Sequence, residues 1–159
     1  VGGTDISGNK LKDENILAKI DVNITADHRA TFRYNDAAKM IDWLVKAFGF
    51  TVHARYADAD GVIQHAQLAF GSSMIMVGNV RDDAYGRMVG GPGSQGGKSV
   101  YVAADNPDEI YARAKTAGAK ILEEPTNRDY GSRDFVCADP EGNVWSFGTY
   151  WPKAHETVG

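Results

Sequence analysis

The sequence predicts an α+β fold built from two tandem βαβββ modules, each a strand and a helix followed by three strands. Three observations predict it. The same order of strand and helix patterns occurs at residues 29–80 and again at 98–152. A glycine-rich stretch at 81–97 separates the two copies and is expected to be a linker. Turn-forming residues stand where the strands of each copy must reverse, which favours antiparallel meanders.

The first module begins with "RATFRY" (29–34), whose alternation of polar and apolar residues is typical of a strand. Asn35 and Asp36 then offer an N-cap for a helix that Gly49 is expected to end. Three strand patterns follow, separated by a turn at Asp60-Gly61 and another at 71–73. They are "TVHARYAD" (51–58), "VIQHAQLAF" (62–70) and "MIMVGNV" (74–80).

The second module repeats this order with "SVYVAAD" (99–105) as its first strand. A helix is expected to open at Asn106, with Pro107 in its first turn and acidic residues near its positive end, and to stop at Gly118. Three further strands are predicted, and the turn at 139–143 joins the last two. They are "KILEEPTNRDYG" (120–131), "RDFVCAD" (133–139) and "VWSFGTYW" (144–151).

Two flanking segments complete the chain. Residues 1–28 are predicted to form an N-terminal arm, within which Ile16–Ile24 fits either an extra strand or a short helix, and 153–159 a C-terminal tail. No stretch approaches the roughly 20 apolar residues of a membrane span. The net charge is −4 without any basic block, which disfavours nucleic acid as a partner.

Cys137 is the only cysteine, so the chain forms no internal disulfide and nothing indicates an oxidising compartment. Its position on an apolar strand favours a buried, unreactive thiol. We therefore expect a cytoplasmic protein that meets neither membrane nor nucleic acid.

The stretches "RYNDAAKMIDWLVKAFGF" and "DPEGNVWSFGTY", in this order, resemble the vicinal oxygen chelate superfamily of glyoxalases, bleomycin-resistance proteins and extradiol dioxygenases. The resemblance covers about residues 29–151. It implies that each module's mixed sheet curls into half of a cup, the glyoxalase/bleomycin-resistance fold. Many relatives complete the cup across two subunits, so the resemblance also implies a homodimer.

Metal-dependent relatives carry four metal ligands of the His, Gln or Glu type on the first and last strands of each module. The resemblance places these positions at Arg29, Met76, Ser99 and Ser146. Arginine offers no free lone pair, methionine is too soft for an oxygen-rich site, and two serines do not replace carboxylate and imidazole. We therefore expect no metal and no cofactor.

The cup lining follows from strand parity, because successive strand residues point to opposite faces of the sheet. The predicted set combines charged, polar, aromatic and thioether side chains, which suits a flat, partly polar organic molecule. The expected lining residues are Arg33, His65, Gln67, Met74, Met76, Tyr101, Ser146 and Trp151. Less specific readings remain open: His65 as a half-exposed strand residue, Arg33 as a surface charge, and the two methionines as core.

The first functional hypothesis is a metal-free, bleomycin-resistance-like protein that binds a small aromatic or heterocyclic compound, as in drug sequestration. The alternative is a glyoxalase-like lyase or isomerase, or a glutathione transferase, in which His65 acts as general base and Arg33 steadies an oxyanion. A third hypothesis is a module that serves assembly only, since one fold hosts many functions.

Overall fold

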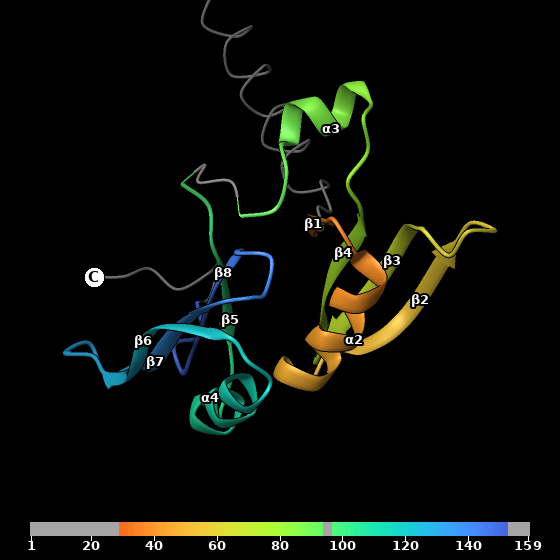
Figure 1. Ribbon diagram of the computed structural model, residues 1–159. Coiled ribbons are helices and arrows are strands. Elements are labelled where there is room, and N and C mark those ends of the chain that lie inside the picture. Colours follow the sequence, from red (N-terminus) through yellow and green to blue (C-terminus); the bar gives the residue numbers. More distant parts are fainter. Residues whose placement is uncertain (1–28, 94–96, 153–159) are drawn as a thin grey trace, which may run out of the picture.

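A computed structural model describes residues 29–93 and 97–152, which form two four-stranded sheets with helices (Figure 1). The predicted arm 1–28 and tail 153–159 lie outside the described residues. The first module contains β1 (Ala30–Tyr34), α2 (Ala37–Phe48), β2 (Thr51–Ala57), β3 (Ile63–Phe70) and β4 (Ser73–Asn79). The second contains β5 (Val100–Ala103), α4 (Pro107–Thr116), β6 (Lys120–Asn127), β7 (Arg133–Ala138) and β8 (Val144–Gly148).

The two sheets have the same topology. The first runs in the order β1-β4-β3-β2 and the second in the order β5-β8-β7-β6. In each, the first and last strands of the module pair in parallel and the other neighbours pair antiparallel. The sheets are curled, so the predicted α+β fold of two tandem βαβββ modules is confirmed.

The two predicted helices begin where the sequence indicates and end at or within two residues of the predicted glycines. The Asp36 carboxylate accepts a hydrogen bond from the Lys39 amide and caps α2, and Gly49 ends that helix in the left-handed region at φ 87°. Pro107 occupies the first turn of α4. No described helix is long and apolar enough to cross a membrane.

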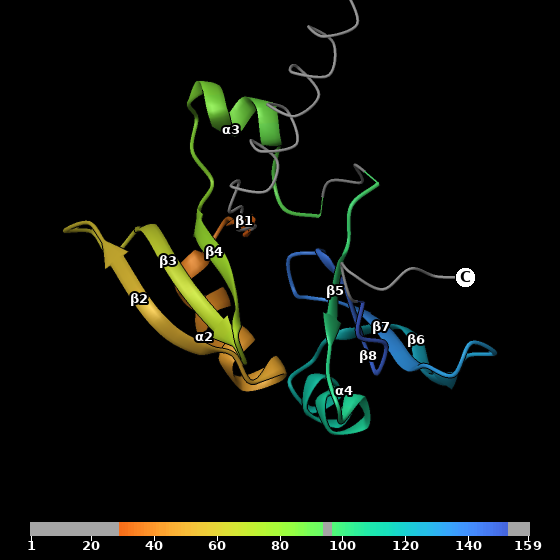
Figure 2. The same cartoon turned by 180° about the vertical axis from the view of Figure 1, so that it is seen from behind.

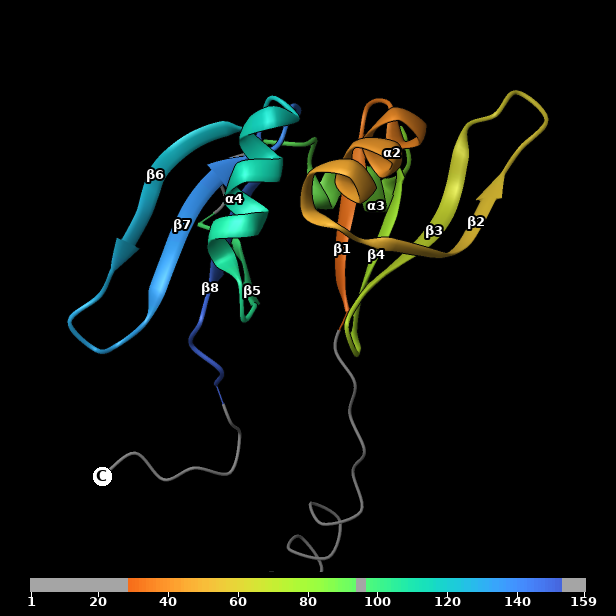
Figure 3. The same cartoon turned by 90° about the horizontal axis from the view of Figure 1, so that it is seen from below.

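One hydrophobic core serves both modules. Figure 3 shows α2 and α4 side by side between the outer strands of the two sheets. Trp145 of β8 is fully buried, and its ring centroid lies 4.7 Å from that of Phe32 and 5.2 Å from that of Phe48. The helix-covered faces therefore meet in the middle of the molecule, and the other face of each sheet points outward.

The turn between β7 and β8 ties the two modules together. Asp139, which is 3% exposed, accepts hydrogen bonds from Tyr34 Oη at 2.7 Å and from Trp145 Nε1 at 3.1 Å. The Glu141 carboxylate accepts hydrogen bonds from the backbone amides of Asn35 and Asp36, at 2.7 and 3.0 Å, at the start of α2. Because Tyr34, Asn35 and Asp36 belong to the first module, these bonds set the position of one module against the other.

The predicted linker 81–97 contains a short helix, α3 (Ala84–Val89), which the sequence patterns did not indicate. Asp83 caps it by accepting from the Gly86 amide at 2.7 Å. Figure 2 shows α3 standing away from both sheets, beyond the end of β4. Its Tyr85 nevertheless reaches back to the first sheet, where the candidate site lies.

Candidate ligand-binding site

The outward face of the first sheet carries the polar side chains that strand parity predicted for it. Ala66 and Leu68 of β3 are fully buried beneath α2, whereas His65 and Gln67, which alternate with them, are half-exposed on the opposite face. In register, Gln67 lies opposite Met76 of β4. This face is therefore mixed in character, and the core lies behind it.

A cavity of about 220 Å³ opens on this face. Its lining comes from β1, β3, β4 and α3. The lining residues are Thr31, Arg33, Gln64, His65, Met76, Val77, Gly78 and Tyr85. Arg33 donates from Nη1 to the Asn79 carbonyl at 3.2 Å, and its Cζ lies 5.6 Å from the centroid of the Tyr85 ring. One planar cation and one aromatic ring thus form a wall of the cavity.

His65 sits between a ring and an amide. The Tyr56 ring on β2 is nearly parallel to the His65 ring, at a centroid distance of 6.2 Å and an interplanar angle of 20°. Gln67 Nε2 lies 3.2 Å from His65 Nε2, so the amide donates when that ring nitrogen carries no proton. Tyr56 is 61% exposed, which leaves its ring free for further stacking.

The outward face of the second sheet carries Tyr101 and Ser146, which lie opposite each other in register on β5 and β8. Tyr101 Oη donates to the Tyr150 carbonyl at 2.9 Å and accepts from the Tyr150 amide at 3.0 Å. Gly148 makes room for this ring, because a Cβ there would lie 2.8 Å from the Tyr101 hydroxyl. The phenol is held rigidly while 40% of the residue stays exposed.

Sequence reasoning missed a charged cluster on this second face. Arg128 contacts both Glu123 and Asp134, at 2.8 and 2.6 Å, and Tyr130 Oη donates to Asp134 at 3.3 Å. The hydrogen bond from Arg128 lowers the pKa of Glu123, and the same contacts, first with Glu123 and then with Asp134, raise the pKa of Arg128. The charged residues in "RDYGSRDF" were the available signal for this cluster. Two irregularities in the β6–β7 pairing prevent strand parity from placing these residues on one face.

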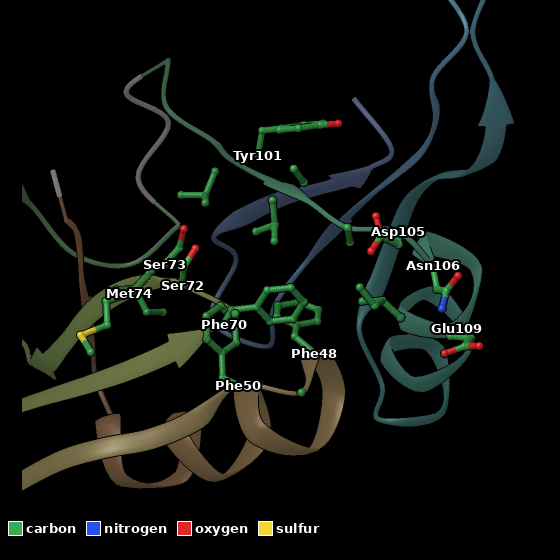
Figure 4. A pocket seen from close by; sticks show the side chains of 18 of the residues that line it. Phe48, Phe50, Phe70, Ser72, Ser73, Met74, Tyr101, Asp105, Asn106 and Glu109 are labelled. Carbon is green, nitrogen blue, oxygen red and sulfur yellow. The ribbon is translucent and has the colours of Figure 1, made fainter. Parts of the chain in front are cut away.

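A larger cavity of about 560 Å³ lies between the modules (Figure 4). Phe48, Phe50 and Phe70 gather on one side of it, and Tyr101 lies on the other. It is bordered by Ala30 and by the strand β5, each of which belongs to an edge strand of its sheet. The volume is in the range of small-molecule sites, and the lining is mainly apolar.

The predicted lining residues therefore fall into two groups. Arg33, His65 and Met76 line the smaller cavity, and Gln67 bonds to His65 beside it. Met74, Tyr101 and Trp151 line the larger cavity. Ser146 lines neither and lies opposite Tyr101. Within one chain these residues therefore do not surround a single space.

The side chains at the four positions where metal-dependent relatives bind their ion are unsuited to binding a metal in this chain. Met76 faces the smaller cavity, Ser146 lies on the second sheet, and Arg29 and Ser99 stand just before β1 and β5. A cation, a thioether and two hydroxyls are not the donor set of a divalent metal. The described residues also contain no group of three or more His, Cys, Asp or Glu side chains that could hold an ion.

Comparison with known proteins agrees with this architecture. Residues 26–147 match the sequence model of the Glyoxalase/Bleomycin resistance protein/Dioxygenase superfamily. The chain is 33% identical over 120 residues to the uncharacterized protein Mb0911c of Mycobacterium bovis, covering 72% of this chain and 76% of that protein. It has the same identity to the uncharacterized protein Rv0887c of Mycobacterium tuberculosis, covering 68% of that protein.

Among solved structures, TioX from Micromonospora sp. ML1 superposes with a TM-score of 0.63 at 31% identity, covering 77% of this chain and 98% of that one. TnmS3, described as an antibiotic binding protein from Streptomyces sp. CB03234, superposes with a TM-score of 0.59 at 22% identity. That match covers 79% of this chain and 97% of TnmS3.

Proposed function

Because the chain belongs to the Glyoxalase/Bleomycin resistance protein/Dioxygenase superfamily, we propose that it is a metal-free binding protein for a small aromatic or heterocyclic compound. The observation that carries the proposal is the wall on the first sheet, where Arg33, His65 and Tyr85 present flat surfaces to one cavity. The Tyr56 ring stacks on His65 beside that cavity and extends the wall. Such surfaces bind planar rings by stacking, with a few hydrogen bonds to fix their orientation.

The proposal includes a homodimer. The cavity of about 220 Å³ is smaller than the roughly 300 Å³ at which ligand sites begin, so the first sheet alone provides half a site. The outward face of the second sheet holds a rigid Tyr101 next to Ser146, and neither residue lines the smaller cavity in the same chain. A second copy that presents this face would close the cup, and β1 and β5 are edge strands whose unpaired backbone groups suit such contacts.

Drug sequestration is the proposed physiological use. TnmS3 has the same fold and is described as an antibiotic binding protein, which supports a role in binding a drug. Sequestration needs shape and a few donors rather than a reacting group, and these are what the wall offers. The buried Cys137 fits a reducing compartment, so we place this role in the cytoplasm.

Binding of planar aromatic compounds to the full-length chain, by calorimetry or fluorescence, tests the function. We expect saturable binding at one site per cup without turnover, and a loss of about tenfold in affinity for Tyr56→Ala, from one ring contact. Phe70→Leu, which alters the larger cavity instead, is the matched control and should keep the affinity. A loss of affinity in Phe70→Leu but not in Tyr56→Ala would show that the ligand binds in the larger cavity. The absence of binding would refute the function.

Two further measurements address the dimer and the metal. The mass from light scattering should correspond to two chains, and a monomer that binds aromatic compounds would refute the shared cup. Elemental analysis of undialysed protein should give no stoichiometric metal. One metal per chain would show that the ligand positions at Met76, Ser99 and Ser146 were misassigned.

An enzyme of the lyase, isomerase or glutathione transferase kind is the second candidate. The observation in its favour is that a base and a cation, His65 and Arg33, line the same cavity. In such an enzyme His65 would remove a proton and Arg33 would stabilise the resulting oxyanion. The enzyme would be established by turnover whose rate rises as a single group loses its proton. This turnover should be lost in His65→Ala. Stoichiometric binding that survives this substitution would exclude it.

A further inference from the structure

The guanidinium of Arg33 is half-buried and has no acidic partner among the residues that the structure describes. Its only hydrogen bond there goes to the neutral carbonyl of Asn79, and its other contact is the Tyr85 ring. The lining of the smaller cavity contains no aspartate or glutamate. A partly desolvated cation without a counter-ion is energetically costly, because part of its hydration is lost and nothing negative replaces it.

Three acidic residues in the turns next to β3 and α3 make other contacts. Asp58 accepts hydrogen bonds from Gln64 Nε2 at 2.8 Å and from the backbone amides of Asp60 and Val62. Asp82 pairs with Arg87 at 2.9 Å, and Asp83 caps α3. None of these carboxylates forms an ion pair with Arg33.

A second cation reinforces the positive potential. Arg81 donates from Nη2 to the carbonyl and to the side-chain oxygen of Gln64, at 2.8 and 2.7 Å. Gln64 itself lines the cavity, and Arg81 makes no ion pair with a described residue. Its charge therefore adds to that of Arg33 near the cavity wall.

The sheet is shaped to hold the Arg33 guanidinium in place. Gly78 lies opposite Arg33 in register on β4, and a Cβ at that position would come within 2.7 Å of Arg33 Nη1. The absence of a side chain at Gly78 lets the guanidinium pass over β4, while Tyr85 covers it from the side of α3. One N–H of the guanidinium is used by Asn79, and the others remain for a ligand.

From this geometry we infer that Arg33 forms an anion subsite next to the ring-binding wall. The protein therefore selects aromatic acids, with a carboxylate or an equally acidic group on the ring system, over neutral and cationic analogues. A carboxylate accepts two parallel hydrogen bonds from a guanidinium, while the adjoining ring stacks on the aromatic wall. This inference rests on the proposed function and specifies the charge of its ligand.

Three probes with the same ring system test the inference: 2-naphthoate, 2-naphthamide and the 2-naphthyltrimethylammonium ion, titrated into the full-length chain at pH 7.5. We expect 2-naphthoate to bind at least about tenfold more tightly than the amide, and the cation to bind most weakly. The affinity for 2-naphthoate should fall as salt is added and that for the amide should not.

Variants separate the charge of Arg33 from other effects. Arg33→Gln should bring 2-naphthoate down to the affinity of the amide and leave the amide within about twofold. Arg33→Lys should keep part of the preference, because it retains the charge without the planar fork. Arg87→Gln, which removes an exposed arginine already paired with Asp82, is the matched control and should change nothing. Circular dichroism checks that each variant is folded.

The outcomes distinguish the two proposals. Equal binding of all three probes, with a loss for all of them in Tyr56→Ala, would refute the anion subsite and leave the ring-binding function intact. A preference for 2-naphthoate that persists in Arg33→Gln would also refute it. Failure of every probe to bind would overturn both.

Discussion

Asp139 is a buried carboxylate whose acceptor capacity is filled by neutral donors. Besides Tyr34 and Trp145, it accepts hydrogen bonds from the backbone amides of Glu141 and Asn143, at 3.1 and 3.0 Å. Burial, and next the charge of Asp139, raise the pKa of the Tyr34 phenol well above its usual value. The phenol therefore stays protonated and continues to donate throughout the physiological range.

Tyr34→Phe removes one of these donors without creating a cavity. We expect the free energy of unfolding in urea to fall by about 1.5–3 kcal/mol, the range for a hydrogen bond to a charged group. Tyr85→Phe, the control, removes a hydroxyl from an exposed ring and should change the free energy of unfolding by less than about 0.5 kcal/mol. Equal effects of the two substitutions would contradict the role given to Asp139.

Cys137 makes the stability of the folded protein depend on pH in the alkaline range. Burial, and then the charge of Asp139, raise the pKa of its thiol to about 12 from 9.0. The unfolded chain therefore loses this proton at a lower pH than the folded chain, so the stabilising contribution is complete below about pH 9 and is lost toward pH 12. The free energy of unfolding should fall less between pH 8 and pH 10.5 for Cys137→Ala than for the unsubstituted protein.

At the scale of single elements, the C-terminus of α2 depends on α4. Arg113 of α4 donates from Nη2 to the carbonyls of Val45 and Lys46, at 3.2 and 3.1 Å, in the last turn of the helix, where Val45 also accepts from the Gly49 amide at 3.1 Å. Its guanidinium lies beside Gly49, where a Cβ would come within 2.7 Å of Nη1. One arginine thus completes the end of one helix from another.

Gly49→Ala and Gly118→Ala form a matched pair. Both glycines follow helices at positive φ, 87° and 85°, so each alanine should cost about 1–2 kcal/mol of backbone strain. Only at Gly49 does the new methyl group displace Arg113, so Gly49→Ala should cost more, since nothing lies within 4 Å of a Cβ at Gly118. The excess should vanish in the Arg113→Ala background, and an excess that persists would exclude Arg113 as its cause.

Sequence patterns predicted the regular elements well and their relative placement poorly. The N-cap at Asp36, the proline in the first turn of α4 and the repeat itself depend on local chemistry, so the sequence predicted them directly. Helix α3 has six residues, a glycine among them, and glycine-rich neighbours, so it carried no periodicity to recognise. The Arg128 cluster depends on the register of β6 and β7, which bulges change.

The relative placement of the two sheets also explains why the predicted cup does not form within one chain. Parity assigns Arg33 and Tyr101 to the lining of one cup, whereas in the structure they line two different cavities. Parity holds within one sheet and contains no information on how two sheets are oriented. The placement of the two sheets depends on the shared core around Trp145, which no local pattern reports.

For the whole molecule, the shared core predicts a single cooperative unfolding transition. Circular dichroism and tryptophan fluorescence should give coincident midpoints in urea, because neither module keeps its core without the other. Glu141→Ala removes the contacts to Asn35 and Asp36 and should lower the midpoint while leaving one transition. Glu124→Ala, at an exposed ion pair with Lys115, is the control. Two separated transitions would show that the modules are independent.

The three tryptophans of the chain occupy three different depths. Trp145 is fully buried between the modules, Trp43 is half-buried with its indole N–H bonded to the Ala117 carbonyl, and Trp151 is 55% exposed at the rim of the larger cavity. Their emission should differ accordingly, blue-shifted for Trp145 and red-shifted and readily quenched by iodide for Trp151. The protein thus contains its own optical reporters: one for the docking of its modules, one for the contact between its helices, and one for whatever occupies the rim.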